Sequence, residues 1–229
     1  MISAVTVLCQ VLRRRPFVEV TGQPDIRWLN QLGIGMVGGA LLMAIPAFVL
    51  TSIGAIRWQF GMFAVTPLVT GVETMAAVAI AEELLFRGFL FQRLVDGLGA
   101  WPAQLVLGGL FLLTHLNNPG MTGATRFWAG INIFLASILF GLAFLRTRSL
   151  AMPIGLHFMA NVTQGPILGF GVSGNGEAGL LRPSFSGAPQ WLTGGTFGLE
   201  ASLPGLISVI LGVILLLLYP TDTLFDHQE

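Results

Sequence analysis

The hydrophobic positions of this chain fall in long runs that are separated by short polar or glycine-rich segments. A run of about 20 apolar residues is long enough to cross a bilayer as an α-helix. The pattern predicts helices over about residues 30–55, 62–96, 101–116, 127–146, 150–165 and 204–219. The second of these is longer than one span, and we expect it to break near Pro67 or Gly71. The sequence therefore predicts an all-α fold, a polytopic membrane helix bundle with about six transmembrane helices.

The segments outside these runs divide the chain into a membrane domain with short flanking parts. We expect an interfacial cytoplasmic segment over residues 1–28, a transmembrane domain over 29–220 and a polar tail over 221–229. Residues 165–205 are rich in Gly, Ser and Pro and long for a connection without secondary structure. We interpret them as an extramembrane loop that covers the mouth of a cavity.

Composition and charge support a membrane protein. Of the 229 residues, 54% are hydrophobic and 10% are charged, whereas soluble domains average about 25% charged residues. The formal net charge is zero, so no nucleic-acid partner is expected. All basic residues are arginine, and most of them lie on one side of the predicted bundle. Because arginine is enriched in cytoplasmic segments, this distribution places both termini of an integral, multi-pass protein in the cytoplasm.

Two adjacent glutamates, Glu82 and Glu83, interrupt the second apolar run. A charged group at membrane depth costs at least about 2.5–3.5 kcal/mol, so such residues usually serve a function. Glu83 and Arg87 are four residues apart on one helix face, which favours an ion pair. Glu82 is turned about 100° away and is free to face a cavity. Glu73 lies near the Arg87 face of the same helix, and we expect it to be a further partner of Arg87.

Two of the histidines lie at a depth that matches the glutamates. Glu82 and His115 are each 14 residues from the cytoplasmic ends of their helices, which corresponds to about 21 Å. His157 lies about 10 Å deep by the same arithmetic, and Asn161 follows on the same helix face. We therefore expect these four side chains to converge in the bilayer interior. Taken singly, Glu83 and Arg87 are explained equally well as a helix-packing pair, and His157 and Asn161 are explained better as interhelical hydrogen-bonding residues than as a site.

The polar residues also form motifs that resemble a known family. Three spaced motifs occur in this order: Glu82-Glu83-x-x-x-Arg87, Phe111-x-x-x-His115 and His157-x-x-x-Asn161. Their order and spacing resemble the CPBP family of intramembrane proteases, which includes CAAX prenyl proteases of the Rce1 type and bacterial Abi proteins. The resemblance covers about residues 75–200, and the stretch WLTGGTFGLEAS also resembles loops of bacterial members.

The resemblance implies an intramembrane endopeptidase, which we place in a bacterial inner membrane. Its partners would be membrane lipid and a membrane-associated or lipidated peptide or protein substrate. The resemblance further implies that Glu82 and His115 activate a water, and that His157 and Asn161 bind the developing oxyanion.

The cofactor stays open at this point, because members are commonly labelled metalloproteases while a metal-free glutamate mechanism is also argued for the family. Glu82, His115 and His157 would supply the two-histidine, one-carboxylate ligand set of a catalytic Zn²⁺, with Glu83 as the base. The ligand count favours zinc, although a role for Glu83 as base would compete with its pairing to Arg87.

Two other functions are compatible with the same residues. A non-proteolytic membrane scaffold or bacteriocin-immunity protein of the same fold would tolerate the loss of Glu82. A small transporter would use the carboxylates as a proton relay, and its uptake would depend on the proton gradient. A protease would instead yield a cleaved product.

Overall fold

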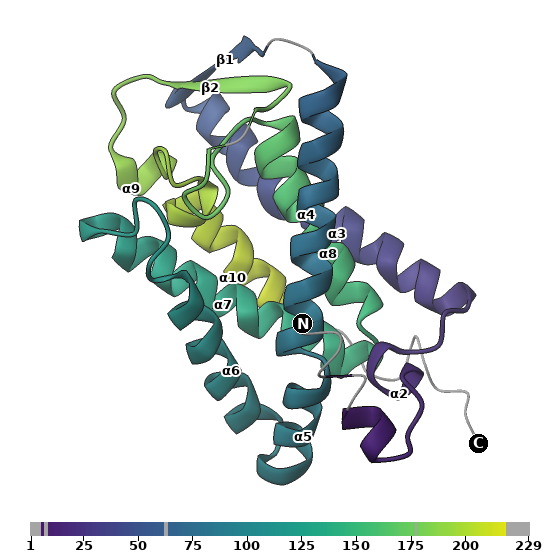
Figure 1. Ribbon diagram of the computed structural model, residues 1–229. Helices are drawn as coiled ribbons and strands as arrows, with labels where there is room; N and C mark the ends of the chain where they lie inside the picture. The colour runs from purple at the N-terminus through teal and green to yellow at the C-terminus, as the bar shows by residue number, and fades with distance from the viewer. Residues whose placement is uncertain (1–5, 7–8, 62–63, 177, 219–229) are drawn as a thin grey trace.

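The described part of the chain is dominated by helices, which confirms the predicted all-α bundle (Figure 1). A computed structural model describes residues 6, 9–61, 64–176 and 178–218, so the predicted tail over 221–229 lies outside the described residues. The elements are α2 (Val18–Thr21), α3 (Ile26–Ser52), β1 (Ile56–Phe60), α4 (Val65–Phe86), α5 (Phe89–Leu98), α6 (Ala100–His115), α7 (Gly123–Thr147), α8 (Ala151–Val162), the π-helical turn η1 (Thr163–Ile167), β2 (Leu181–Phe185), α9 (Gln190–Thr193), the 3₁₀ turn η2 (Leu199–Ala201) and α10 (Leu203–Leu218).

The bundle exposes large apolar side chains on its outer faces and buries one pair of charged side chains. Within the described residues, α3 and α7 are each long and apolar enough to cross a membrane, and α10 is a shorter apolar helix. Large apolar side chains are exposed along the outer faces, among them Val37, Leu41, Phe48, Leu211 and Leu215. By contrast, Glu83 and Arg87 are fully buried. This distribution suits a lipid environment, in which ionisable groups face the protein interior.

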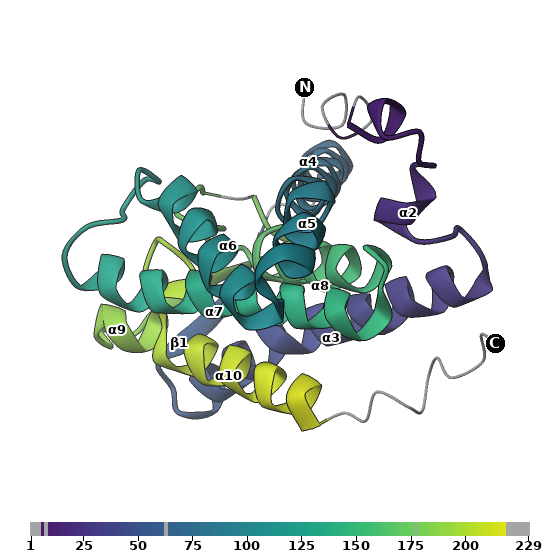
Figure 2. The ribbon, with the colours of Figure 1, turned by 90° about the horizontal axis from the view of Figure 1, so that it is seen from below.

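Helices α3 and α8 are held together by a seam of glycines. A Cβ atom on Gly39 of α3 would overlap the carbonyl oxygen of Leu156, and a Cβ atom on Gly155 of α8 would overlap that of Leu32. Small residues let membrane helices approach to backbone contact. On the other side of the molecule, α7 lies between α6 and α10 (Figure 2). The seam sets the position of α8, which supplies two of the polar residues described below.

The second predicted helix is interrupted, but not where we expected. Helix α4 runs through Pro67 and Gly71 without a break, because Pro67 lies in the first turn, where its missing N–H costs nothing. The break between α4 and α5 falls at Gly88, whose φ and ψ are −69° and −132°. A Cβ atom there would overlap the carbonyl oxygen of Leu84. The break leaves Arg87 at the end of α4, inside the bundle.

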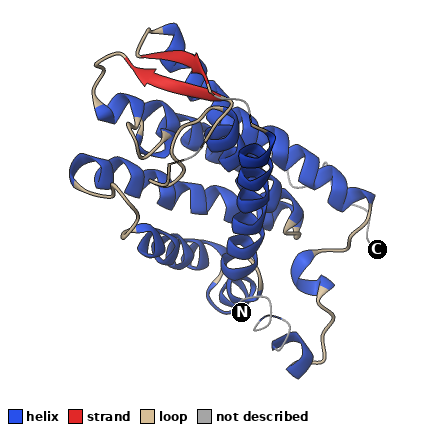
Figure 3. Cartoon of the chain, turned by 45° about the horizontal axis from the view of Figure 1, so that its top comes forward, coloured by secondary structure: helices blue, strands red, loops and turns tan. Residues whose placement is uncertain are grey.

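The segment over 165–205 has secondary structure that the sequence pattern did not predict. Strand β2 pairs antiparallel with β1, and Trp58 lies opposite Pro183. The two strands lie across one end of the bundle, at the end opposite α5 (Figures 1 and 3). Each strand has only five residues, and a proline within a strand argues against assigning it from sequence. The segment then returns through α9 and η2 to α10, so it brings loop residues back over the bundle.

Candidate active site

A cavity of about 370 Å³ lies among α4, α6, α8 and the loop that follows α8. Glu82, His115, His157 and Asn161 all line this cavity. The structure therefore brings together the four side chains that the depth argument expects to converge. Ser173 of the loop also lines it, and helical periodicity gives no signal for such a loop residue.

Glu82 faces the cavity, while the adjacent Glu83 is turned into the bundle. The Glu82 side chain is 29% exposed, and that of Glu83 is 0% exposed. The Oε2 atom of Glu82 is buried, has no hydrogen-bond partner in the protein and lies 3.8 Å from Nε2 of His157. This distance is too long for a direct hydrogen bond. A buried carboxylate oxygen without a protein partner needs a water or a ligand, so this point is suited to a reacting water.

Glu83 connects Arg87 to His157. Arg87 Nη1 donates to Glu83 Oε1 at 3.2 Å, and Nη2 donates to the carbonyl oxygen and Oγ of Ser137 at 2.8 and 2.6 Å. Nδ1 of His157 lies 2.9 Å from the same Glu83 oxygen. Because an ionised carboxylate only accepts, Nδ1 of His157 carries the hydrogen. Glu83 thus orients His157 and leaves its Nε2 directed at Glu82, a role that the sequence spacing with Arg87 did not indicate.

The expected contact between Glu73 and Arg87 is absent. Glu73 is exposed, and the side-chain hydrogen bonds of Arg87 go to Glu83 and Ser137. The two residues share one side of α4 but are 14 positions apart in the sequence, which separates them by about 21 Å along the helix axis. The expected contact was wrong because a shared helix face does not bring together two residues that lie about four turns apart along the axis.

Aromatic rings enclose the arginine and the histidine. The guanidinium carbon of Arg87 lies 5.1 Å from the ring centre of Phe111 and 5.3 Å from that of Phe140. The ring of Phe140 stacks on His157, with centres 4.9 Å apart and an interplanar angle of 11°. Such cation–π and stacking contacts hold both groups in place and keep water away from the Arg87 side.

His115 lines the cavity and is bound through one ring nitrogen to the backbone of its own helix. Its Nδ1 atom lies 2.7 Å from the carbonyl oxygen of Phe111. A carbonyl oxygen can only accept, so Nδ1 donates and Nε2 is the basic nitrogen of the neutral ring. His115 is therefore equipped to accept a hydrogen bond or a proton at Nε2.

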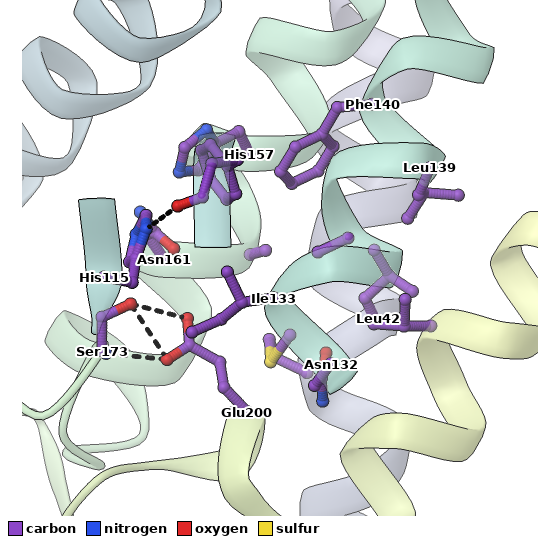
Figure 4. Close-up of a pocket in the computed structure, with 15 residues that line it drawn as sticks. Leu42, His115, Asn132, Ile133, Leu139, Phe140, His157, Asn161, Ser173 and Glu200 are labelled. Carbon is purple, nitrogen blue, oxygen red and sulfur yellow. Dashed lines mark hydrogen bonds between the residues drawn. The ribbon is translucent and has the colours of Figure 1, made fainter. Parts of the chain in front are cut away.

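A second, smaller chamber of about 50 Å³ adjoins the same residues (Figure 4). His115, His157 and Asn161 line it together with Ser173 and Glu200, and its other walls are mostly apolar. Burial raises the pKa of the Glu200 carboxyl, while hydrogen bonds from Ser173 and the attraction of His115 and His157 oppose that rise. Sequence reasoning missed Glu200, although an acidic residue just before the last apolar run was a usable signal.

The three residues considered as zinc ligands do not surround one point in this arrangement. Glu82 and His157 face one another, and His115 reaches the same cavity. Among the residues that the structure describes, however, no three or more His, Cys, Asp or Glu side chains are grouped closely enough to hold a metal ion. A three-ligand zinc site normally needs ligand distances of about 2.0–2.2 Å from nitrogen and oxygen. The geometry present fits a water beside Glu82 better than a three-ligand zinc ion.

Comparisons with known proteins place these residues in a family context. Residues 58–163 match the family model described as type II CAAX prenyl endopeptidase Rce1-like, a range that includes all of the predicted site residues. The chain is also 26% identical over 174 residues to a Bacillus subtilis (strain 168) protein named Uncharacterized protein YyaK. That alignment covers 70% of this chain and 55% of the relative, so the chain spans about half the relative's length. No solved structure gives a significant match.

Proposed function

We propose that this chain, whose residues 58–163 match the type II CAAX prenyl endopeptidase Rce1-like family model, is an intramembrane endopeptidase that uses Glu82 to activate a water. One observation carries the proposal. The unpartnered Oε2 of Glu82 faces Nε2 of His157 across 3.8 Å, in a cavity that also holds His115 and Asn161. A water in the cavity beside these two atoms can hydrogen-bond to both, and so lie next to a base and a group that can stabilise charge.

Each residue of the site has its own role in the proposed hydrolysis. Glu82 takes a proton from the water, and the resulting hydroxide attacks the carbonyl carbon of the scissile peptide bond. The oxyanion that forms accepts hydrogen bonds from Asn161 and from Nε2 of protonated His157, whose positive charge Glu83 offsets through Nδ1. His115 orients the water through Nε2. The proton on Glu82 then passes to the nitrogen of the leaving amine as the C–N bond breaks, which returns Glu82 to its ionised form.

The position of the cavity supports a proposal for the class of substrate. Glu82 and His157 belong to helices of a bundle whose outer faces are apolar. A substrate that reaches them is a membrane-associated or lipidated peptide or protein that enters from the bilayer. We also propose that the chain is a multi-pass protein of a bacterial inner membrane with both termini in the cytoplasm, as the arginine distribution indicates.

Replacing Glu82 with Gln tests the proposal. We expect turnover of a quenched-fluorescence library of lipidated peptides in proteoliposomes to fall by about 10²–10⁴-fold, because the base is lost while the side-chain shape is kept. Glu73→Gln is the matched control, since it makes the same change at an exposed position of the same helix. A Glu82→Gln protein that cleaves peptide at the wild-type rate would contradict the proposal. Full cellular function of a cleavage-deficient Glu82→Gln chain would point to a scaffold or immunity role.

Metal removal distinguishes the metal-free glutamate mechanism from the zinc mechanism. We expect purified protein that has been stripped by a strong chelator, and shown by elemental analysis to hold no zinc, to retain its peptidase activity. The physical reason is that Glu82 and His157 lie close together, but among the described residues no third ligand is grouped with them. Loss of activity together with about one zinc per chain, and recovery of both on adding Zn²⁺, would instead establish Glu82, His115 and His157 as its ligands.

A further inference from the structure

A polar pocket of about 330 Å³ lies at the end of the bundle where α3 begins, apart from the candidate active site. Three arginines line it, Arg27, Arg146 and Arg148, together with a single carboxylate, Asp25. Oδ1 of Asp25 is already engaged, because it accepts from the backbone N–H of Trp28 at 2.9 Å and caps α3. No ion pair with a described residue neutralises any of the three arginines. This arginine pocket is therefore electropositive and suited to an anion.

The walls of the arginine pocket are held in place by hydrogen bonds. The carbonyl oxygen of Thr21 accepts from Nε1 of Trp28 at 3.2 Å and from the backbone N–H of Leu150 at 3.1 Å. Gln31 also lines the pocket and is only 6% exposed, and its Oε1 has no hydrogen-bond partner among the described residues. A buried amide oxygen without a partner needs a donor from a water or a ligand. The pocket thus offers positive charge to an anion and an acceptor to a hydroxyl group.

An apolar groove of about 300 Å³ lies beyond the arginine pocket, along α3, α8 and α10 (Figure 2). Its lining residues are apolar except for Ser208, and two of them are glycines, Gly38 of α3 and Gly212 of α10. Leu41 and Leu215 also line it and are 51% and 67% exposed. The groove is therefore open on the outer face of the bundle, where a hydrocarbon chain can enter it.

The pocket and the groove adjoin along two helices. The residues of α3 that line them recur every three or four positions and so share one helix face: Trp28 and Gln31 in the pocket, then Ile34, Gly38, Leu41 and Ile45 in the groove. At the start of α8, Ser149 lines the pocket, and Met152, three positions later, lines the groove. Arg146 Nη2 donates to the carbonyl oxygen of Leu217 at 2.9 Å, and the adjacent Leu216 lines the groove. The charged pocket thus leads directly into the apolar groove.

We propose that the arginine pocket and the groove together bind one anionic phospholipid, with its phosphodiester among the arginines and an acyl chain in the groove. Basic pockets between membrane helices are suited to anionic head groups, and the guanidinium fork matches the geometry of phosphate oxygens. A glycerol head group adds a hydroxyl that can donate to Oε1 of Gln31. A zwitterionic head group would instead place a positive charge beside the arginines. The inference does not depend on the proposed peptidase function.

Lipid titration of the delipidated full-length protein, followed by native mass spectrometry, tests the proposal. We expect one equivalent of dioleoyl phosphatidylglycerol per chain to bind about 10-fold more tightly than dioleoyl phosphatidylcholine, because of its net charge. Glycerol 1-phosphate, which has a phosphate but no acyl chains, should bind more weakly than the anionic lipid.

Two double variants and one single variant test the charges. Arg27→Gln/Arg148→Gln should weaken phosphatidylglycerol binding by about 30-fold, the combined effect of two basic residues on an anionic head group. Arg57→Gln/Arg182→Gln is the matched control, because it removes the same charge from exposed positions of β1 and β2, at the other end of α3. Asp25→Asn keeps an oxygen that can cap α3 but removes the opposing charge, so it should tighten binding by about 5-fold.

The outcomes decide between a built lipid site and its alternatives. Equal affinity for phosphatidylcholine would show general lipid adhesion, and glycerol 1-phosphate bound as tightly as the lipid would show a site for a soluble phosphate. Equal losses in the two double variants would show attraction to overall charge. Each of these results would overturn the proposal. The head-group comparison uses wild-type protein, so it decides the matter even where an arginine variant fails to fold. Because binding is measured without peptide cleavage, failure of the peptidase function would leave this test intact.

Discussion

The Glu83 carboxylate accepts hydrogen bonds from two charged or polar neighbours at once, Arg87 from its own helix and His157 from α8. All three side chains are buried, so each depends on the others for its electrostatic compensation. Removing one leaves an uncompensated group in a medium that solvates charge poorly. The same carboxylate thus supports the fold and orients a residue of the site.

Replacing Arg87 distinguishes a role in the stability of the fold from a role in the reaction. We expect Arg87→Ala to lower the free energy of unfolding in detergent by about 3–5 kcal/mol, because it breaks a buried pair and leaves Glu83 with one partner fewer. Arg93→Ala is the matched control, since Arg93 also pairs with a carboxylate, Asp96, at 2.9 Å, but its side chain is 36% exposed. That surface pair contributes only about 0–1 kcal/mol. An inactive Arg87→Ala protein as stable as Arg93→Ala would assign Arg87 to the reaction instead.

At the scale of elements, the seam between α3 and α8 determines where His157 and Asn161 lie. Backbone meets backbone at Gly39 and Leu156, one residue before His157. A side chain inserted at this seam cannot be absorbed by a flexible neighbour, because the atoms it meets are main-chain atoms. The whole of α8 must move, and its polar residues move with it.

Substituting glycines of α3 tests this dependence. We expect Gly39→Leu to destabilise the bundle by about 1–3 kcal/mol or more through overpacking, and to lower peptidase activity by displacing His157. Gly33→Leu on the same helix is the control, because a Cβ atom there meets nothing within 4 Å. It should leave activity unchanged and leave stability equal or slightly raised, since leucine favours helix over glycine. Thermal unfolding in detergent and the peptide assay report the two effects, and equal behaviour of the two variants would refute the seam's role.

The same elements show what sequence alone can predict. Long apolar runs located α3, α6, α7 and α10 to within a few residues, because each of these helices is built from a continuous apolar stretch. The break at Gly88 was missed because it depends on a close approach to the Leu84 carbonyl, which composition does not encode. Strands β1 and β2 were missed because they are short and pair across more than 100 residues of chain, as Trp58 and Pro183 do.

Across the whole molecule, the residues on helices were easier to predict than the contacts between distant segments. Depth and helical periodicity predicted that four side chains would converge, and the structure places all four in one cavity: Glu82, His115, His157 and Asn161. The prediction was possible because each residue lies on a regular helix, whose geometry is known in advance. The contacts between Arg87 and Ser137 and between Ser173 and Glu200 depend on how separate segments pack, and no local sequence pattern predicts them. The sequence therefore predicted which helix side chains share the cavity, while the groups that orient them required the fold.

The two partners of Glu83 also bear on how the chain is made. Arg87 is available as soon as α4 is synthesised, but His157 follows Glu83 by 74 residues, which corresponds to about 4–15 s of translation at roughly 5–20 residues per second. During that interval α4 carries Glu82 and Glu83 without α8 beside it. Placing either carboxylate in lipid costs free energy. The nascent α4 is therefore expected to wait in the translocon or at the membrane surface until α8 emerges. Catalytic competence and stable insertion would then arrive together, so that an incomplete chain is an inactive one.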